Sequence, residues 1–367
     1  MNLNFFEPDL HLPPISEQEL SDNDVLLEIT HLKKELQNEV LILGHHYQSD
    51  DVIQFADYVG DSLALAKVAQ KKPYSFIIFC GVHFMAETAD MLTPKNCQVI
   101  LPDPNAGCSM ADMAGISEVE IAWKTISKNS SQKIIPITYI NCTAELKAFV
   151  GRNAGSICTS SNAKKIIQWA LDSGDKLFFF PDQHLGRNTC AQLGISLDEM
   201  IIYNPRQTNG GLSAEQILKA KVILWYGYCS VHKGFTLEHV HNFRKKSPQT
   251  TIIVHPECSY EVVSNSDLSG STNFIIEVIS QSPDGSEFAV GTEINLVQRL
   301  CKMFPTKKIH SLSPYQCLCT TMYRIRPRWL LQSLRSIKKG RPENVVSVSH
   351  QIQEESLLAL EQMLRLS

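Results

Sequence analysis

Short apolar runs alternate with amphipathic stretches along most of this chain. The first amphipathic stretch, residues 22–38, predicts a helix because its apolar residues recur at helical spacing, at Val25, Leu26, Ile29, Leu32 and Leu36. After it come apolar runs of strand length, each followed by a helical pattern. That order is typical of α/β proteins with parallel strands. The first 25 or so residues are polar, contain Pro13-Pro14 and predict an N-terminal arm.

The strand-and-helix order repeats three times. Each unit opens with a strand that ends in polar residues, at 40–49, 133–143 and 250–259. A helix start, a second strand–helix pair and a strand that runs into cysteine follow in each case, the last at 97–110, 221–232 and 307–322. The middle unit is longer than the other two, which predicts an insertion near residues 187–220. The fold expected is therefore α/β, with three similar αβα three-layer units around a pseudo-threefold axis.

The repeat pattern predicts four parts of the chain. The arm and the first unit occupy 1–110, the second unit with its insertion occupies 111–230, and the third occupies 231–319. Residues 320–367 are predicted to form helices, over 322–337 and 351–366, that pack back on the body.

Composition narrows the functional classes. The chain has 367 residues, a formal net charge of −4 and no basic surplus, which argues against nucleic-acid binding. No signal peptide or membrane-length apolar run is visible, so we expect a cytoplasmic protein without a membrane anchor. Eleven cysteines are many for a reducing compartment, where disulfides do not persist. Some are expected to be buried and others to bind a metal.

Three cysteines hold the same place in the three units, after the closing strand: Cys108, Cys229 and Cys319. The carboxyl ends of parallel strands carry the site in such sheets, so these thiols are expected to converge. Three thiolates indicate zinc or an iron–sulfur cluster, with one metal position left open for substrate. Because Cys317 and Cys319 form a CxC pair, the spacing alone leaves the third ligand open.

Polar residues recur at two further places in each unit. Pairs spaced i, i+2 follow the opening strands, where both side chains of an extended segment share a face: His45 and Tyr47, Tyr139 and Asn141, His255 and Glu257. Hydroxyl residues stand at the next helix starts, where three helix N-termini would bind an anion: Ser62, Ser160 and Thr272. His232, three residues after Cys229, is expected near the metal. Hydrogen-bonded loop residues and ordinary helix caps are the alternative explanation for each of these residues taken singly.

At these residues the sequence closely resembles the quinolinate synthase family, in its longer form, from about Leu41 to Arg328. The resemblance is carried by many motifs in order, among them HHYQSDDVIQFADYVGDSLALA, GVHFMAETADMLTP, LPDPNAGCSMADM, YINCTAELKA, CTSSNA, PDQHLGRNT, GYCSVH, VHPEC, SGST, GTEINLVQRL and CLCTTM.

The resemblance implies an enzyme of de novo NAD biosynthesis. It would condense iminosuccinate with dihydroxyacetone phosphate to quinolinate, phosphate and water. A [4Fe–4S] cluster would lie at the junction of three αβα domains, bound by Cys108, Cys229 and Cys319, the last preferred over Cys317 by its place before the T-M of CLCTTM. The implied iminosuccinate contacts are His45, Ser62, Tyr139, Asn141, Ser160, His255, Glu257 and Thr272. Tyr47 and His232 match further active-site positions, and Tyr47, His232, His255 and Glu257 are the candidate catalytic residues.

Two other hypotheses stay open at this stage. One is a different cluster-dependent hydro-lyase, and the other is a metal-sensing or cluster-carrying module without catalysis. The small-molecule substrates are the expected partners, with functional coupling to an aspartate-oxidising enzyme as a further expectation. No GxGxxG, GxxxxGK[ST], HExxH or GxSxG motif occurs in the chain.

Overall fold

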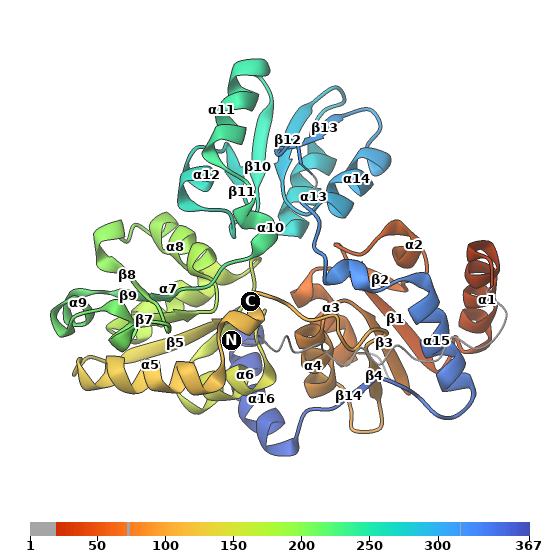
Figure 1. Cartoon of the computed structure of the whole chain (residues 1–367), viewed down its shortest axis with the longest axis horizontal. Helices are drawn as coiled ribbons and strands as arrows, with labels where there is room; N and C mark the ends of the chain where they lie inside the picture. The colour runs from red at the N-terminus through yellow and green to blue at the C-terminus, as the bar shows by residue number, and fades with distance from the viewer. Residues whose placement is uncertain (1–19, 72–73, 316) are drawn as a thin grey trace, which may run out of the picture.

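The protein folds into three α/β lobes, each a short sheet with the helices that connect its strands (Figure 1). The computed structural model describes residues 20–71, 74–315 and 317–367. The predicted N-terminal arm lies outside the described residues up to position 19. The α/β class and the parallel strands are confirmed, and the three lobes surround a common centre (Figure 1).

The first lobe has a five-stranded sheet in the order β14-β4-β3-β1-β2, parallel except for β14. Its strands are β1 (Val40–His45), β2 (Tyr58–Gly60), β3 (Phe76–Cys80), β4 (Gln98–Ile100) and β14 (Val345–Val346). Its helices are α1 (Asp22–Glu35), α2 (Asp50–Ile53), α3 (Ser62–Lys71) and α4 (His83–Leu92). All six residues of β1 are buried, which is why that strand is apolar up to its end.

The second lobe has a fully parallel sheet in the order β6-β5-β7-β9-β8. Its strands are β5 (Ile134–Tyr139), β6 (Ser156–Cys158), β7 (Lys176–Phe180), β8 (Met200–Tyr203) and β9 (Val222–Trp225). Its helices are η1 (Ala111–Met113), α5 (Ile116–Lys128), α6 (Ala144–Arg152), α7 (Ala163–Ser173), α8 (Gln183–Gln192), η2 (Leu197–Glu199), η3 (Thr208–Gly211) and α9 (Ala214–Lys219). Within residues 187–220 the chain therefore adds a strand, β8, at the sheet edge.

The third lobe has four parallel strands in the order β11-β10-β12-β13. They are β10 (Thr251–Val254), β11 (Leu268–Ser269), β12 (Glu287–Gly291) and β13 (Lys308–Ser311). Its helices are α10 (Ser230–Lys233), α11 (Leu237–Lys246), α12 (Tyr260–Ser264), α13 (Thr272–Gln281) and α14 (Ile294–Met303).

The C-terminal segment is η4 (Met322–Arg324), α15 (Pro327–Lys338) and α16 (His350–Leu366). A single helix over 322–337 is wrong: Pro327, which lacks a backbone N–H, starts a new helix at its first position. Helix α15 packs against α1, and α16 packs against α6. Both helices lie far in sequence from the elements they cover.

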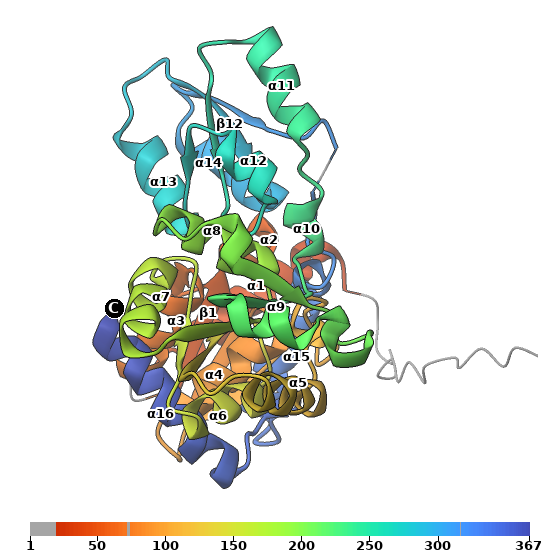
Figure 2. The same ribbon diagram turned by 90° about the vertical axis from the view of Figure 1, so that its left-hand side faces the viewer.

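The lobes do not share one core equally. A single apolar cluster runs through the first and second lobes and includes α15 and α16, whereas the third lobe has two smaller clusters of its own. Figure 2 shows the third lobe standing clear of the other two, with α16 alongside α6. None of the helices in the described ranges is long and apolar enough to cross a membrane.

Candidate active site

A cavity lies where the three lobes meet, and polar residues from every lobe line it. All the residues singled out in the sequence reach it: His45, Tyr47, Ser62, Cys108, Tyr139, Asn141, Ser160, Cys229, His232, His255, Glu257, Thr272 and Cys319. The space open to the centres of water molecules is about 70 Å³. One water needs roughly 10–15 Å³ by that measure, so the cavity has room for several water-sized groups.

The chain makes a turn directly after β1 and after β10, and this turn places the paired residues at the cavity. His45 ends β1 and His255 follows β10, and in both cases the ring Nδ1 accepts the backbone N–H two residues on, at 3.2 and 3.3 Å. Those N–H groups belong to Tyr47 and Glu257. The expectation that the pairs share a cavity holds, but the extended backbone invoked for it is wrong for the pairs that begin at His45 and His255.

The same hydrogen bonds set the histidine tautomers. Burial is the first cause that lowers the pKa of His255, to about 3, and it also holds the pKa of His45 well below its usual range. Both rings are therefore neutral near pH 7. Because Nδ1 accepts a hydrogen bond, the proton resides on Nε2, so each ring offers one N–H donor.

A chain of hydrogen bonds crosses the cavity from the first lobe to the second. Tyr47 Oη lies 2.9 Å from Thr292 Oγ1, which lies 3.2 Å from His232 Nε2. His232 Nδ1 is 2.9 Å from Glu257 Oε2, and Tyr139 Oη donates to Glu257 Oε1 at 2.6 Å. Five side chains from all three lobes thus form one continuous hydrogen-bonded network.

The charge states along this network follow from burial and contacts. Burial alone would raise the pKa of Glu257, but the positive charge that neighbouring imidazoles take up in acid and the hydrogen bonds from His232 and Tyr139 outweigh it and lower that pKa. Burial, with the Glu257 carboxylate close by, raises the pKa of Tyr139 and of Tyr47 well above the usual range. Glu257 is therefore the ionised acceptor and the two phenols are protonated.

Thr292 was missed by the sequence analysis. It lies just after β12, in the GTE of GTEINLVQRL, next to Glu293. That acid, Glu293, caps α14 by accepting from two backbone N–H groups, and it also accepts from the backbone N–H of Cys319 at 3.3 Å. The signal available in the sequence was position, because Thr292 follows the second strand of its unit.

The expected helix-start positions are confirmed for Ser62 and Thr272 but not for Ser160. Ser62 and Thr272 are the first residues of α3 and α13, whereas Ser160 lies in the turn before α7. The caps are their neighbours: Asp61 accepts from a backbone N–H of α3, and Ser271 from one of α13. The hydroxyls of interest are thus not consumed by capping.

Two buried polar atoms at this cavity have no hydrogen-bond partner, Asn141 Oδ1 and Thr272 Oγ1. Among the described residues no lysine or arginine lines the space. An anion bound here would therefore be held by hydroxyls, neutral imidazoles and the N-termini of α3 and α13. Orphaned buried groups of this kind point to a ligand, because leaving them unpaired costs free energy.

Residues at the cavity wall and behind it tie the lobes together, and Asp61 is one of the lining residues. Asp61 Oδ2 accepts from Ser161 Oγ at 2.7 Å and from Asn273 Nδ2 at 2.8 Å, which joins the starts of three helices from three lobes. Two of the three strand-end loops are also held by a helix of another lobe. Arg299 of α14 donates to two carbonyls after β1 at 2.7 and 2.5 Å, and Asn188 of α8 donates to two carbonyls after β10, both at 2.8 Å. The side chains that line the cavity are thus positioned by the junction itself.

The three thiols of Cys108, Cys229 and Cys319 face the same cavity. Burial raises the pKa of Cys108 to about 12, and Cys319 adds to the rise. Burial and Glu257 raise the pKa of Cys229, with further contributions from the other two thiols, so all three lie within electrostatic reach of one another. Cys317 does not line the cavity and packs against an apolar cluster of the third lobe.

A second set of metal-binding types exists at the same place. It consists of Cys229, His232 and Glu257. The possible ligand atoms, one from each of these residues, all lie within 4.8 Å of one another. In the structure His232 and Glu257 are hydrogen-bonded to each other, so a metal bound by this set would have to replace that contact.

A buried hydrogen-bonded network, neutral imidazoles and unpaired polar atoms at a three-lobe junction define an α/β enzyme that acts on a small molecule. The sequence model described as "Quinolinate synthetase A protein" matches residues 27–365. The chain belongs to this quinolinate synthetase A family.

Named relatives agree with this assignment. The chain is 52% identical over 356 residues to the quinolinate synthase of Bacillus subtilis (strain 168), with 96% of each chain covered. It is 51% identical over 346 residues to the quinolinate synthase of Bacillus cereus (strain ATCC 10987 / NRS 248), with 94% of each covered.

Proposed function

We propose that this chain makes quinolinate by condensing iminosuccinate with dihydroxyacetone phosphate in the central cavity. Quinolinate synthase activity in NAD biosynthesis follows from the family and from relatives at about half identity. The substrates and the residue roles rest on the cavity. The observation that carries them is the buried network of Tyr47, Thr292, His232, Glu257 and Tyr139, which joins all three lobes.

The cavity suits a small dicarboxylate that carries an N–H group. Asn141 Oδ1 is a buried acceptor without a donor, so a substrate N–H or O–H would satisfy it. The Nε2–H groups of His45 and His255 are donors suited to carboxylate oxygens. Ser62, Ser160 and Thr272, beside the N-termini of α3 and α13, would hold the remaining carboxylate or the phosphate.

Cys108, Cys229 and Cys319 would hold a [4Fe–4S] cluster at the pseudo-threefold junction, in agreement with a donor set of three thiols that face one cavity. When bound, the cluster would supply a Lewis-acidic iron with a position open to substrate. Ligand thiols must lose their protons, and the cation overcomes the raised pKa values that burial gives them. We also place the protein in the cytoplasm, since all eleven cysteines are free thiols.

The protein's own groups would move protons around the bound substrate. Glu257, ionised and aligned by Tyr139, would accept a proton from a substrate carbon or nitrogen. The path through His232 and Thr292 would carry a proton between Glu257 and the phenol of Tyr47. A group that accepts a proton at one side of the cavity and returns it at the other suits a sequence of phosphate loss, isomerisation and ring closure.

An anaerobic assay with purified enzyme tests this function. Quinolinate is expected only when both iminosuccinate and dihydroxyacetone phosphate are present, and Cys229→Ser is expected to abolish it. Cys301→Ser, which replaces an exposed thiol outside the cavity, is the matched control and keeps activity. A different hydro-lyase or a non-catalytic carrier would give no quinolinate with both substrates.

A mononuclear metal at Cys229, His232 and Glu257 is the second candidate, favoured by the proximity of their ligand atoms. It predicts about one zinc per chain and no acid-labile sulfide. The two candidates are separated by metal and sulfide analysis.

A further inference from the structure

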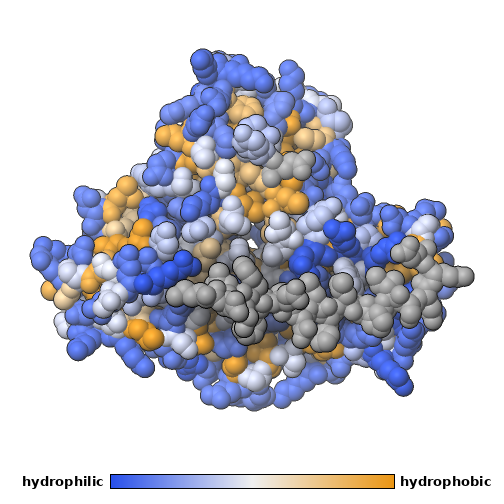
Figure 3. Space-filling model, viewed as in Figure 1, coloured by the Kyte–Doolittle hydropathy of each residue, from blue (hydrophilic) through white to orange (hydrophobic). Residues whose placement is uncertain are grey.

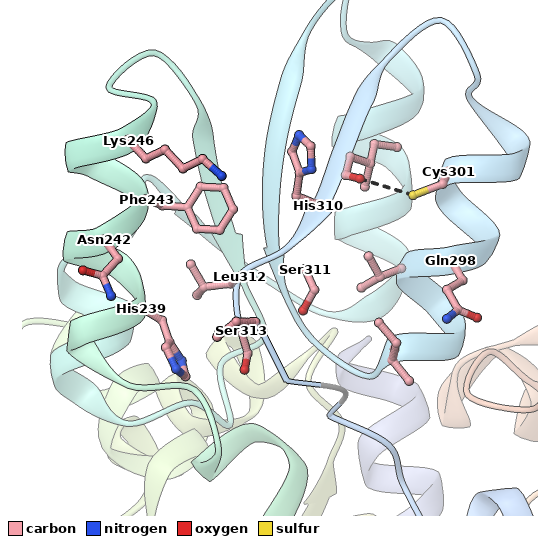
Figure 4. A pocket seen from close by; sticks show the side chains of 14 residues that line it. His239, Asn242, Phe243, Lys246, Gln298, Cys301, His310, Ser311, Leu312 and Ser313 are labelled. Carbon is pink, nitrogen blue, oxygen red and sulfur yellow. Dashed lines mark hydrogen bonds between the residues drawn. The ribbon is translucent and has the colours of Figure 1, made fainter.

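The third lobe carries a groove of about 570 Å³ at the outer edge of its sheet, away from the central cavity. The edge strand β13 forms its floor, and helices α11 and α14 form its walls (Figure 4). Phe243 of α11 and Ile294 of α14 are half-buried and contribute apolar surface, and beneath them lie the buried side chains of Val297 and Leu312. Figure 3 shows hydrophobic side chains gathered on this lobe between the two helices.

The same sheet edge is covered in the other two lobes. In the first lobe β4 takes the place of β13, and the C-terminal strand β14 pairs with it antiparallel. In the second lobe β9 takes that place, and β8 from the insertion pairs with it in parallel. In the part of the chain that the structure describes, β13 has β12 on one side and no strand on the other.

The backbone of β13 is arranged to accept another strand. Lys308 N and Leu312 N donate to carbonyls of the β12 side, at 2.9 Å each. Because backbone groups alternate between the two sides of a strand, the N–H and C=O of Ile309 and Ser311 point to the open edge. The thiol of Cys301 is 3.3 Å from the Ile309 carbonyl, and the hydroxyl of Ser311, which lines the groove, is buried without a partner.

The charge of the groove selects among peptides. Lys246 is the one lysine or arginine among the described residues that line it; His239 and His310 line it too, and His310 Nε2 lies 3.4 Å from the Glu287 carboxylate, whereas no carboxylate is part of the described lining. The strands that fill the equivalent places follow acidic residues directly: β8 follows Asp198 and Glu199, and Glu343 stands two residues before β14. Both β8 and β14 are apolar. We therefore expect the edge of β13 to bind an apolar segment that follows acidic residues.

We propose that this groove binds an extended, apolar segment of another polypeptide, with acidic residues at its end, as a fifth strand of the third sheet. The bound segment would pair with the outward N–H groups of Ile309 and Ser311 and with the Ser311 carbonyl, as in other cases of strand addition to a sheet edge, while the Ile309 carbonyl keeps the Cys301 thiol as its donor. Its apolar side chains would pack between α11 and α14. Its carboxylates would lie near Lys246.

The probe is a fluorescent peptide with the sequence of residues 198–203, DEMIIY, titrated with the full-length enzyme and followed by anisotropy. Saturable binding is expected. Ser311→Pro removes an outward N–H and places the proline ring at the open edge, so it is expected to weaken binding roughly tenfold or more. Ser311→Thr keeps that N–H and is expected to bind like wild type. A peptide with Ile201→Pro is expected not to bind.

Two further measurements keep the proposal open to refutation. Lys246→Glu, an exposed substitution on α11, is expected to weaken binding without any change in the sheet. No binding by wild type, or equal binding by wild type, Ser311→Pro and Lys246→Glu, overturns the proposal. Sedimentation velocity tests the other possible occupant, a second copy of this chain. If wild type is a dimer, Ser311→Pro is a monomer, and neither binds the peptide, the groove is a contact between two copies of this chain. That result would overturn the proposal too.

Discussion

The central cavity and the groove on the third lobe are both bounded by strands of the same kind of sheet, yet they differ in size and in chemistry. The volume of the groove is about 570 Å³, and that of the cavity is about 70 Å³. The cavity draws buried polar groups and thiols from three lobes, whereas the groove draws apolar groups from one. Volume therefore does not locate the catalytic site in this fold. The convergence of buried, partly unpaired polar groups does.

The largest effect on activity is expected from a substitution in the central cavity, at Glu257. Glu257→Gln keeps the shape of the side chain but removes the carboxylate at the centre of the proton path, so kcat is expected to fall by about 10²–10⁴-fold. Glu261→Gln, an exposed change four residues on, is the matched control and should leave kcat alone. A Glu257→Gln enzyme with full activity would remove this residue from the mechanism.

A smaller effect is expected at Thr292, which joins Tyr47 to His232. Thr292→Val has the same shape without the hydroxyl, so it breaks the path and should lower kcat by roughly tenfold, with less effect on KM. Thr292→Ser restores the hydroxyl and should restore most of kcat. Equal kcat values for the valine and serine variants would show that the path is structural only.

Acid should destabilise the protein through its buried neutral histidines. The folded-state pKa of His255 is about 3, against 6.5 for the free group, so the unfolded chain binds the proton first as pH falls. The contribution of the neutral His255 ring to the free energy of unfolding is therefore fully present above pH 6.5 and is lost as the pH falls toward 3. Going from pH 7 to 5 should cost on the order of 2 kcal/mol from this residue, and His45 acts in the same direction.

Urea unfolding at the two pH values measures that loss. His255→Gln, which cannot take up a proton, should reduce the pH dependence. His350→Gln, an exposed change on α16, is the control and should leave the dependence unchanged. The same pH dependence in wild type and His255→Gln would contradict the buried neutral histidine.

The smallest effect on catalysis is expected in the groove. Lys246→Ala should leave kcat and KM as in wild type, because Lys246 lines only the outer groove and not the cavity. A loss of quinolinate formation in this variant, with an unchanged fold by circular dichroism, would show that the two regions are coupled and that the contrast drawn here is wrong.

Much of the fold and site could be predicted because the information is local. The alternation of apolar runs and helical patterns gave the α/β class, and recurrence at strand ends picked out residues such as His45 and Tyr139 that do meet in one cavity. The backbone turn after β1 was not predictable, since it depends on the His45 ring accepting the N–H of Tyr47.

What failed depends on contacts between distant segments. Strand β14 joins the first sheet from residues 345–346, and no local pattern shows its partner β4. The place of Thr292 in the network depends on its hydrogen bond with Tyr47, which lies 245 residues away in the sequence. The capping of α3 by Asp61 rather than Ser62 is a competition between adjacent side chains, which spacing does not decide.

The most direct test of the central claim is metal analysis of the anaerobically purified enzyme and two neighbouring variants. We expect about four irons and four acid-labile sulfides per chain in wild type and in Cys317→Ser, and their loss in Cys319→Ser. Because the two cysteines are two residues apart but only Cys319 lines the cavity, the pair is its own control. Zinc in place of iron, or a cluster kept by Cys319→Ser and lost by Cys317→Ser, would contradict the account.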